Sequence, residues 1–241
     1  MPGEKIQNQN MNERLGIVFL HHRADRVVLN NLRSVQVHNP GATIVTVSAG
    51  EPLPGGYTLK ATPELKRLHG TNAGRSSDRM ICSWFTQRRE QCDKWWIIEW
   101  DVFCATSVRD YYRPVWDFPF VAASVRLPHR EPEWGWFKAF RKKHWFKPVK
   151  KMPVAYQPFM MGAVPVLYLL SEPALAATCT MLLENPLLVG NGELRFATAA
   201  NRCGYPPCGF SPPHDQITWK DWPAVPPGPM ISHPVKHYVE F

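Results

Sequence analysis

Apolar runs alternate with amphipathic stretches in the first part of the chain. Residues 15–20 form a continuous apolar run, which is typical of a strand buried on both faces of a sheet. Asp25 can cap a helix that follows at once, and the Asn-Pro-Gly sequence at 39–41 would end it. Residues 43–47 form a second apolar run. A strand, a helix and a second strand in this order predict two parallel strands joined by a crossover helix.

The rest of the chain continues this alternation. We expect strands at 95–98, 120–125 and 166–170, and helices from 76 or 77 to about 92, from 172 to 184 and from 193 to 202. Ser171, followed by a proline in the first turn, and Asn191 are suitable caps for the last two helices. The pattern predicts an α/β fold with a Rossmann-like, mostly parallel central sheet flanked by helices.

Proline sets the C-terminal half apart. The 241 residues include 24 prolines, most of them after residue 113. We therefore expect a loop-rich C-terminal half and exclude a helical bundle or coiled coil. Hydrophobic residues make up 44% of the chain and charged residues 20%, which is typical of a globular protein. We expect a disordered lead-in over residues 1–13 and a single domain over 14–241.

Signals of export and membrane insertion are not recognisable. Residues 1–14 are polar and lack the apolar core of a signal peptide. The longest apolar stretch, 159–170, is too short for a bilayer span, which needs about 20 residues. The six cysteines form no Cys-x-x-Cys pair, which argues against a zinc site and favours reduced thiols. We expect a cytoplasmic protein.

The net charge of +8 suggests an anionic partner, such as nucleic acid, an acidic membrane surface or a phosphorylated small molecule. Much of the excess lies within residues 138–151, where lysines and arginines occur without an acidic side chain. Tryptophans and phenylalanines are interleaved with these charges from residue 134 onward. We call residues 134–151 the basic-aromatic segment. The charge of the remaining chain is therefore less informative about partners.

Two carboxylates end one of the predicted strands. Glu99 and Asp101 follow the apolar run at 95–98 and, two residues apart on an extended chain, project to the same side. Ligands of open α/β sheets bind at the carboxyl ends of the strands. Two close carboxylates are costly unless a cation lies between them or one is protonated, and Mg²⁺ and Mn²⁺ favour such oxygen ligands. The alternative is a solvated strand end that happens to be acidic.

The order of these features resembles the nucleotide-sugar-binding half of GT-A glycosyltransferases. The residues that carry the resemblance are Asn-Ala-Gly-Arg at 72–75, before a helix, and Glu99-Trp100-Asp101 after an apolar strand. In that family an Asp-x-Asp-like motif ends the central strand, and its last aspartate coordinates Mn²⁺ or Mg²⁺. Here glutamate replaces the first aspartate. The resemblance implies a GT-A fold, a Mn²⁺ or Mg²⁺ ion held by Asp101 with Glu99, and a nucleotide-diphosphate sugar donor.

The resemblance extends over residues 14–241, with a donor-binding half at 14–126 and an acceptor half at 127–241. Pro-Phe-Met-Met-Gly at 158–162 is similar to the acceptor-side segment of such enzymes. Many of them also bring a late histidine onto the metal, which here implies His233. Lys236 would add a positive charge near the diphosphate. The acceptor would be a saccharide or a lipid-linked molecule.

The same resemblance suggests residues that contact the nucleotide. His21 ends the first predicted strand, where the nucleobase usually lies, although it could simply cap that strand. Arg75, Asp78 and Arg79 precede or open the helix before the metal-binding strand. Alternatively, Asp78 is a first-turn helix charge and Arg79 is a solvated side chain.

A general base is needed if the transfer inverts the anomeric centre, because a carboxylate must then accept the proton of the acceptor hydroxyl. The resemblance suggests Glu193, since it stands near the start of a helix after the acceptor strand. A glutamate in a first helical turn can equally be a simple helix stabiliser. Asp215 is the second candidate for the base. A retaining enzyme would need neither residue in this role.

The basic-aromatic segment allows three functional interpretations and one structural alternative. The first interpretation is an active-site lid, in which Trp134, Trp136 and Trp145 stack on sugars. The second is a peripheral contact to an anionic membrane that carries lipid-linked acceptors. The third is binding of single-stranded nucleic acid, which we favour least of these three because no nucleic-acid motif accompanies the segment. The structural alternative is a solvated charge run whose tryptophans pack on the core.

Two other functions use the same features differently. A nucleotidyltransferase or a metal-dependent phosphohydrolase could use the carboxylates of Glu99 and Asp101. A nucleic-acid-binding protein led by the basic-aromatic segment would not depend on Asp101 at all. The metal-dependent glycosyltransferase is the interpretation that we favour.

Overall fold

A parallel β-α-β unit opens the fold. The computed structural model describes residues 13–59, 77–135, 137, 154–163, 167–185, 191–210 and 228–240. Strand β1 (Leu15–His21) is followed by helix α1 (Arg26–His38) and strand β2 (Thr43–Ser48), which pairs in parallel with β1. The Asp25 side chain caps α1 by accepting hydrogen bonds from the backbone N–H groups of Val27 and Val28. The unit predicted from the apolar pattern is thus confirmed.

Seven strands make up the central sheet, in the order β10-β6-β9-β4-β1-β2-β3. The remaining members are β3 (Tyr57–Thr58), β4 (Lys94–Glu99), β6 (Phe120–Ala122), β9 (Leu167–Ser171) and β10 (Cys208–Gly209). Strand β9 runs antiparallel to both of its neighbours, β4 and β6, and the other neighbouring pairs are parallel. The predicted α/β fold with a mostly parallel central sheet is therefore confirmed.

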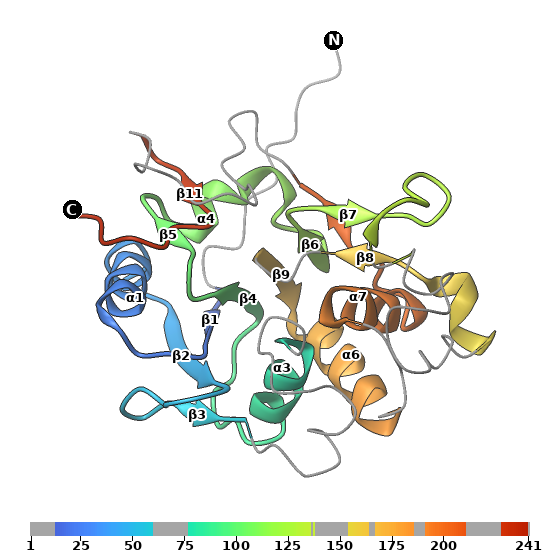
Figure 1. Ribbon diagram of the computed structural model, residues 1–241, viewed down its shortest axis with the longest axis horizontal. Coiled ribbons are helices and arrows are strands. Elements are labelled where there is room, and N and C mark those ends of the chain that lie inside the picture. The colour runs from blue at the N-terminus through green and yellow to red at the C-terminus, as the bar shows by residue number, and fades with distance from the viewer. Residues whose placement is uncertain are drawn as a thin grey trace.

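Helices cover both faces of this sheet (Figure 1). Helices α3 (Ser77–Phe85), α6 (Glu172–Glu184) and α7 (Gly192–Arg202) pack on one face, and α1 and the short α4 (Val108–Tyr111) pack on the other. Alternate residues of β4 serve the two faces: Trp95 and Ile97 contact the first group of helices, and Trp96 and Ile98 the second. Each such side chain stabilises the fold by about 1.5–3 kcal/mol through its burial.

Two small antiparallel sheets flank the central one. Strand β5 (Phe103–Cys104) pairs with β11 (Ile231–Ser232), and β7 (Val125–Arg126) pairs with β8 (Gly162–Ala163). Two 3-10 helices, η2 (Arg113–Val115) and η3 (Val154–Phe159), complete the described elements. The β5–β11 pair is the functionally important one, because it places a C-terminal segment beside the chain that leaves β4 (Figure 1).

The caps predicted for the last two helices are confirmed, since Ser171 caps α6 and Asn191 caps α7. Two predicted boundaries are wrong. Helix α3 ends at Phe85 rather than near residue 92, because the Thr86 and Gln87 side chains donate hydrogen bonds to the Ser83 carbonyl in the last turn.

The strand expected at 120–125 is also interrupted. Strand β6 pairs with β9 as far as Ala122, opposite Tyr168, and Val125 pairs instead with Ala163 in a separate sheet. The apolar composition of these residues is continuous, but the hydrogen-bonding partner changes along the way. An apolar run alone cannot reveal such a change of partner.

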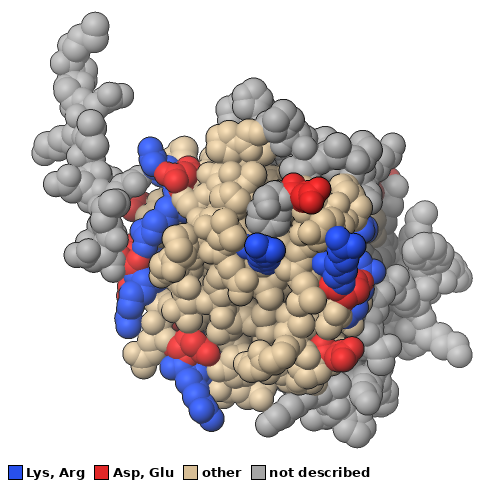
Figure 2. Space-filling model, turned by 90° about the vertical axis from the view of Figure 1, so that its left-hand side faces the viewer, with Lys and Arg blue, Asp and Glu red and all other residues tan. Residues whose placement is uncertain are grey.

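The exposed side of α1 shows no large excess of one charge. Figure 2 views the side on which α1 lies, where basic and acidic side chains are interspersed mostly toward the margins of the view. Leu29 and Val37 of α1 are 48% and 56% exposed.

Within the described residues, no helix has both the length and the apolar character needed to cross a bilayer.

Candidate metal centre and donor site

Strand β4 delivers two carboxylates to the carboxyl-terminal edge of the parallel strands. Its buried sequence Lys94–Ile98 fixes it in the middle of the sheet, and Glu99 is its last residue. The chain then turns, with the Val102 N–H donating to the Glu99 carbonyl at 3.2 Å. Asp101 lies in this turn and is only 5% exposed. The acidic side chains therefore leave a rigid strand end rather than a loose loop.

His233 reaches the same place from the far end of the chain. Strand β11 pairs with β5 so that Ser232 lies opposite Phe103, and the Val235 N–H donates to the Asp101 carbonyl at 2.7 Å. His233 Nε2 consequently lies 3.3 Å from Asp101 Oδ1, and both side chains are almost fully buried. The antiparallel pairing of two short strands is what joins these residues.

Glu99, Asp101 and His233 together form a group suited to a metal ion. One potential ligand atom from each lies within 4.8 Å of the others. The two carboxylate oxygens suit both Mn²⁺ and Mg²⁺ as ligands, and the imidazole nitrogen favours Mn²⁺. All three predicted ligands are thus brought together. Lys236 Nζ lies 3.9 Å from the second oxygen of Asp101, at the rim of the group.

The electrostatics of this group favour a cation. Glu99 keeps some exposed surface, but its carboxyl has lost most of its contact with water. This desolvation is the largest cause that raises the pKa of Glu99 to about 8, and the negative charges of Asp101 and Glu193 are the next largest. Lys236 has a smaller effect in the opposite direction. Without a bound cation, Glu99 is therefore largely protonated at neutral pH. A divalent ion would favour the ionised form by offsetting the repulsion between the carboxylates.

A small cavity of about 50 Å³ adjoins the acidic group. Its lining residues come from the ends of β1 and β4 and the start of α3: Leu20, His21, His22, Ser77, Met80, Glu99 and Trp100. His21 is buried at the end of β1, and its Nδ1–H donates to the Arg23 carbonyl at 2.9 Å. Burial lowers the pKa of His21, so its imidazole is neutral near pH 7 and Nε2 is the acceptor.

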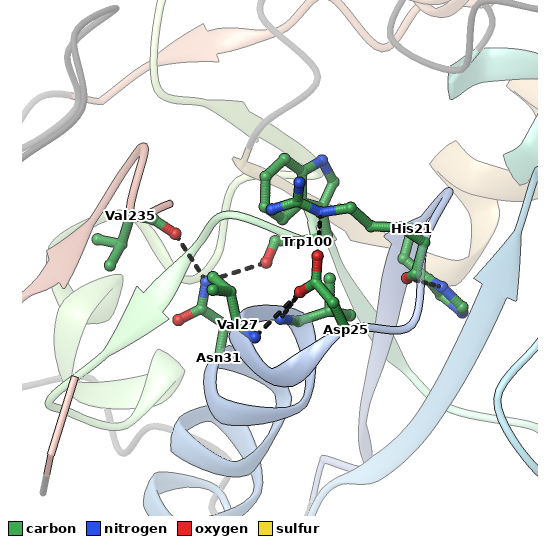
Figure 3. A network of polar contacts seen from close by, with 8 residues as sticks. His21, Asp25, Val27, Asn31, Trp100 and Val235 are labelled. Atoms are coloured by element: carbon green, nitrogen blue, oxygen red, sulfur yellow. Dashed lines mark hydrogen bonds and ion pairs between the residues drawn. The ribbon is translucent and has the colours of Figure 1, made fainter. Parts of the chain in front are cut away.

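Trp100 forms one wall of this cavity. The Arg23 guanidinium lies over its ring at 3.9 Å from the ring centre, and the His22 ring meets it edge-on at 5.4 Å. Figure 3 shows Trp100 near the start of α1, between His21 on one side and Val235 on the other. The middle residue of the Glu-x-Asp sequence is thus a platform between the acidic group and the β1 end.

Asp78 and Arg79 occupy the first turn of α3 but are turned into the protein. The Asp78 side chain is fully buried and accepts hydrogen bonds from Arg195 of α7 at 2.6 and 2.7 Å. Arg79 is 6% exposed and donates to the Leu182 carbonyl at 3.4 Å, so the alternative of a solvated Arg79 is wrong. The nucleotide contact suggested for both residues remains a prediction.

Glu193 stands in the first turn of α7, where Asn191 accepts a hydrogen bond from its backbone N–H at 2.7 Å. Its negative charge contributes to the raised pKa of Glu99, so the two carboxyl groups interact electrostatically. The helix-stabilising and catalytic interpretations of Glu193 are compatible with this position.

Trp134 is partly buried and packs against the core. Its ring lies 4.8 Å from that of Phe137, and an added Cβ on Gly162 of β8 would come within 2.2 Å of the indole. This placement agrees with the alternative that tryptophans of the basic-aromatic segment pack on the core. Arg75, Trp136, Trp145 and Asp215 lie outside the described residues.

Sequence reasoning missed two polar residues that organise the site. Asn31 lies on the apolar face of α1 among Val28, Leu32 and Val35, and Arg195 is the partner of Asp78. Asn31 left a detectable signal, because helical spacing places it among buried positions. Arg195 left none, since its partner is distant in sequence.

Comparisons with known proteins give limited similarity. No family model matches the chain, and no curated protein matches it. Among solved structures, the chain is similar to galactosyltransferase LgtC in complex with donor and acceptor sugar analogs, with 12% identity, a TM-score of 0.41, and coverage of 81% of this chain and 73% of that one. An active-site mutant of LgtC gives 13% identity, a TM-score of 0.41, and coverage of 81% and 72%.

Proposed function

We propose that this chain is a metal-dependent glycosyltransferase of the GT-A type, which moves a sugar from a nucleotide-diphosphate donor to an acceptor. One observation carries the proposal. Two carboxylates and an imidazole from distant parts of the sequence meet at the carboxyl edge of a parallel sheet, beside a cavity. Ligands of open α/β sheets bind at this edge.

Asp101 and His233, with Glu99, are the residues that would hold the ion. A bound divalent cation would neutralise the charge that grows on the departing nucleoside diphosphate. Mn²⁺ and Mg²⁺ both suit this task, and the imidazole favours Mn²⁺. Lys236, at the rim of the group, would add a mobile positive charge for the same phosphates.

The cavity beside Trp100 is our proposed entrance to the nucleoside site. His21 offers an acceptor nitrogen there, and the Trp100 ring offers a flat surface. Arg75, Asp78 and Arg79 would support the nucleotide from the side of α3, with Asp78 acting through Arg195. In this proposal residues 14–126 form the donor-binding half and 127–241 the acceptor half, with His233 and Lys236 reaching back from the acceptor half to the donor phosphates.

Glu193 is our proposed general base for an inverting transfer, and Asp215 is the alternative. The negative charge of Glu193 helps to raise the pKa of Glu99, which supports a place for this base near the acidic group. The base would accept the proton of an acceptor hydroxyl as the new bond forms. A saccharide or a lipid-linked acceptor would enter near the basic-aromatic segment, whose Trp134, Trp136 and Trp145 we suggest as acceptor contacts.

Calorimetric titration of the full chain with UDP and GDP tests this function. We expect one of these nucleotides to bind in the presence of Mn²⁺, and removal of Mn²⁺ with EDTA to abolish that binding. Asp101→Asn should weaken it by about 100-fold, whereas Asp110→Asn, on an exposed aspartate of α4, should leave it unchanged. Metal-independent binding, or full binding by Asp101→Asn, would contradict the proposal.

The reaction products separate this function from its nearest competitor. A glycosyltransferase releases a nucleoside diphosphate from a nucleotide sugar, whereas a nucleotidyltransferase releases pyrophosphate and a phosphohydrolase releases inorganic phosphate. Incubation with a panel of UDP- and GDP-sugars, followed by chromatography of the nucleotides, distinguishes the three. Release of UDP or GDP without further phosphate loss is the expected result.

A further inference from the structure

One side chain of α1 joins the two segments that carry the acidic group. Asn31 is completely buried, and its Nδ2 donates a hydrogen bond to the Trp100 carbonyl at 3.1 Å and another to the Val235 carbonyl at 2.9 Å. Figure 3 shows Asn31 on α1 with both bonds. Trp100 immediately precedes Asp101, and Val235 follows His233 by two residues. The amide thus bridges the backbones of the two ligand-bearing segments.

The bridge needs a side chain that carries two donors on one nitrogen, and the Asn31 amide provides them without adding a charge. Two carbonyl oxygens from different segments converge on one nitrogen, and each is an acceptor that repels the other. A neutral amide nitrogen carries two N–H donors on a single atom and can satisfy both. The same requirement fixes the orientation of the Asn31 side chain, because a reversed amide would place its own oxygen against both carbonyls.

A backbone hydrogen bond completes the arrangement. The Val235 N–H donates to the Asp101 carbonyl at 2.7 Å, so the peptide groups around residue 235 are bonded to the chain after β4 on one side and to α1 on the other. His233 Nε2 then lies 3.3 Å from Asp101 Oδ1. The bonds of Asn31 act on the backbones next to both ligands and on neither ligand side chain.

Ser34, one turn further along α1, provides a contrast. Its hydroxyl donates to the Asn31 carbonyl at 2.7 Å and accepts from the Cys104 N–H at 3.0 Å. Ser34 is as deeply buried as Asn31 and also ties α1 to the chain after β4. It bonds to neither the Trp100 nor the Val235 carbonyl, so it anchors β5 without spanning the two ligand-bearing segments.

We infer that Asn31 is a positioning residue for the metal centre, which holds Asp101 and His233 at the separation that one divalent ion requires. The inference rests on the proposed function for the identity of the ion. Groups that orient metal ligands from behind typically alter metal affinity by 10–100-fold when they are removed. The bonds on Trp100 and Val235 give Asn31 that role through the backbone.

The test compares Asn31→Leu with Ser34→Ala in the full chain. Leucine keeps the branched shape of asparagine but has no donors. Mn²⁺ affinity is measured with the metal alone, from the electron paramagnetic resonance signal of free Mn²⁺. We expect Asn31→Leu to weaken Mn²⁺ binding by about 10–100-fold and Ser34→Ala by less than about 3-fold. Equal affinities in wild type and Asn31→Leu, or equal losses in the two variants, would overturn the inference.

A metal-free measurement separates this inference from the proposed function. Hydrogen exchange of the peptide covering residues 228–240 should be about 10-fold faster in Asn31→Leu than in Ser34→Ala, because the segment loses its bond to α1. Exchange that is equal in the two variants overturns the inference whatever the metal does. If wild type binds no Mn²⁺, the metal in the proposed function is wrong. The hydrogen-exchange rates then still test whether the Asn31 amide joins the two segments.

If Asn31→Leu does not fold, Asn31→Ser replaces it in both measurements. Serine keeps one hydroxyl donor and leaves space for a water molecule, so the fold is disturbed less. We then expect a smaller loss of Mn²⁺ affinity, still at least about 5-fold and larger than that of Ser34→Ala. A Mn²⁺ affinity equal to that of wild type overturns the inference in this case as well.

Discussion

Asp78 at the start of α3 and Arg195 at the start of α7 form a buried, two-pronged ion pair. Arg195 Nε lies 2.7 Å from one carboxylate oxygen, Nη2 lies 2.6 Å from the other, and neither side chain is more than 1% exposed. The pair joins the N-termini of two helices beside the carboxyl edge of the sheet. Because Glu193 lies two residues before Arg195, the position of this proposed base depends on the same contact.

Replacing one partner of this pair should destabilise the fold strongly. In Asp78→Asn the buried Arg195 guanidinium loses the negative charge of Asp78, and breaking a buried ion pair typically costs 3–5 kcal/mol. Asp110→Asn is the matched control, since Asp110 pairs with Arg113 on the surface and such pairs contribute less than about 1 kcal/mol. Urea denaturation followed by circular dichroism measures both free energies of unfolding. Comparable decreases in the free energy of unfolding of the two variants would show that the buried pair stabilises the fold no more than a surface pair does.

Gly192, the first residue of α7, should not tolerate a side chain. An added Cβ would lie 2.9 Å from Asp78 Oδ1 and 3.0 Å from Ser77 Oγ. Asp78 cannot move aside, because both of its oxygens are bonded to Arg195. The overpacking costs about 1–3 kcal/mol, which exceeds the gain of up to about 1 kcal/mol that alanine brings to a helix.

Gly41→Ala is the control for Gly192→Ala, because nothing lies within 4 Å of an added Cβ at Gly41. We expect Gly192→Ala to lower the thermal midpoint by several degrees and Gly41→Ala to leave it nearly unchanged. Calorimetric scans of the two variants beside wild type provide the comparison. A Gly192→Ala protein as stable as wild type would mean that the α3 and α7 termini are more loosely packed than described.

The successes of sequence reasoning have local physical causes. The core of β1 and β4 is visible because central parallel strands are apolar on both faces, and the caps Asp25, Ser171 and Asn191 are visible because capping uses the adjacent backbone. Glu99 and Asp101 are recognisable as candidate ligands because they directly follow an apolar strand in the sequence. The predictions that failed concern contacts between residues that are distant in sequence.

The end of β6 depends on where β9 begins, and the Asp78–Arg195 pair depends on how two helices cross. Neither relationship leaves a mark within a short window of residues. Asn31 lies between these cases. Its place among Val28, Leu32 and Val35 predicts a buried amide, and a buried amide requires partners, but the sequence does not say which carbonyls those partners are.

Glu99 should make stability depend on pH. Its pKa is about 8 in the folded chain against an ordinary value of 4.5, so between these values the folded state binds more protons than the unfolded state. The contribution of protonated Glu99 is therefore complete below pH 4.5 and is lost as the pH rises toward about 8. In EDTA, wild type should lose stability over this range, by at most about 1.4 kcal/mol per pH unit.

Glu99→Gln isolates this effect, because glutamine resembles the protonated acid and does not titrate. Urea unfolding in EDTA at several pH values between 5 and 8 should show a difference between wild type and Glu99→Gln that changes steadily with pH. A constant difference would mean that Glu99 ionises normally. With Mn²⁺ present the ionised form is favoured, so metal binding near pH 7 should release a proton, which calorimetry in buffers of different ionisation enthalpy detects.

The two candidate bases can be distinguished by where a substitution acts. Removing a general base lowers turnover by about 10²–10⁴-fold without weakening donor binding, since the base contacts the acceptor hydroxyl. We expect this result for Glu193→Gln, measured as nucleoside diphosphate release from the nucleotide sugar that wild type consumes. Glu184→Gln is the control, for which we expect unchanged turnover, because Glu184 is the last residue of helix α6 and has no proposed role in the reaction. Asp215→Asn provides the competing variant.

Each outcome of this comparison assigns the base differently. Loss of turnover in Asp215→Asn with full turnover in Glu193→Gln moves the base to Asp215 and leaves Glu193 as a helix-stabilising residue beside Asn191. Full turnover in both variants would indicate a retaining transfer, which needs no carboxylate in this position. Loss of donor binding in Glu193→Gln would point instead to the electrostatics of Glu99, because the negative charge of Glu193 helps to raise the pKa of Glu99 and removing that charge changes the ionisation of Glu99.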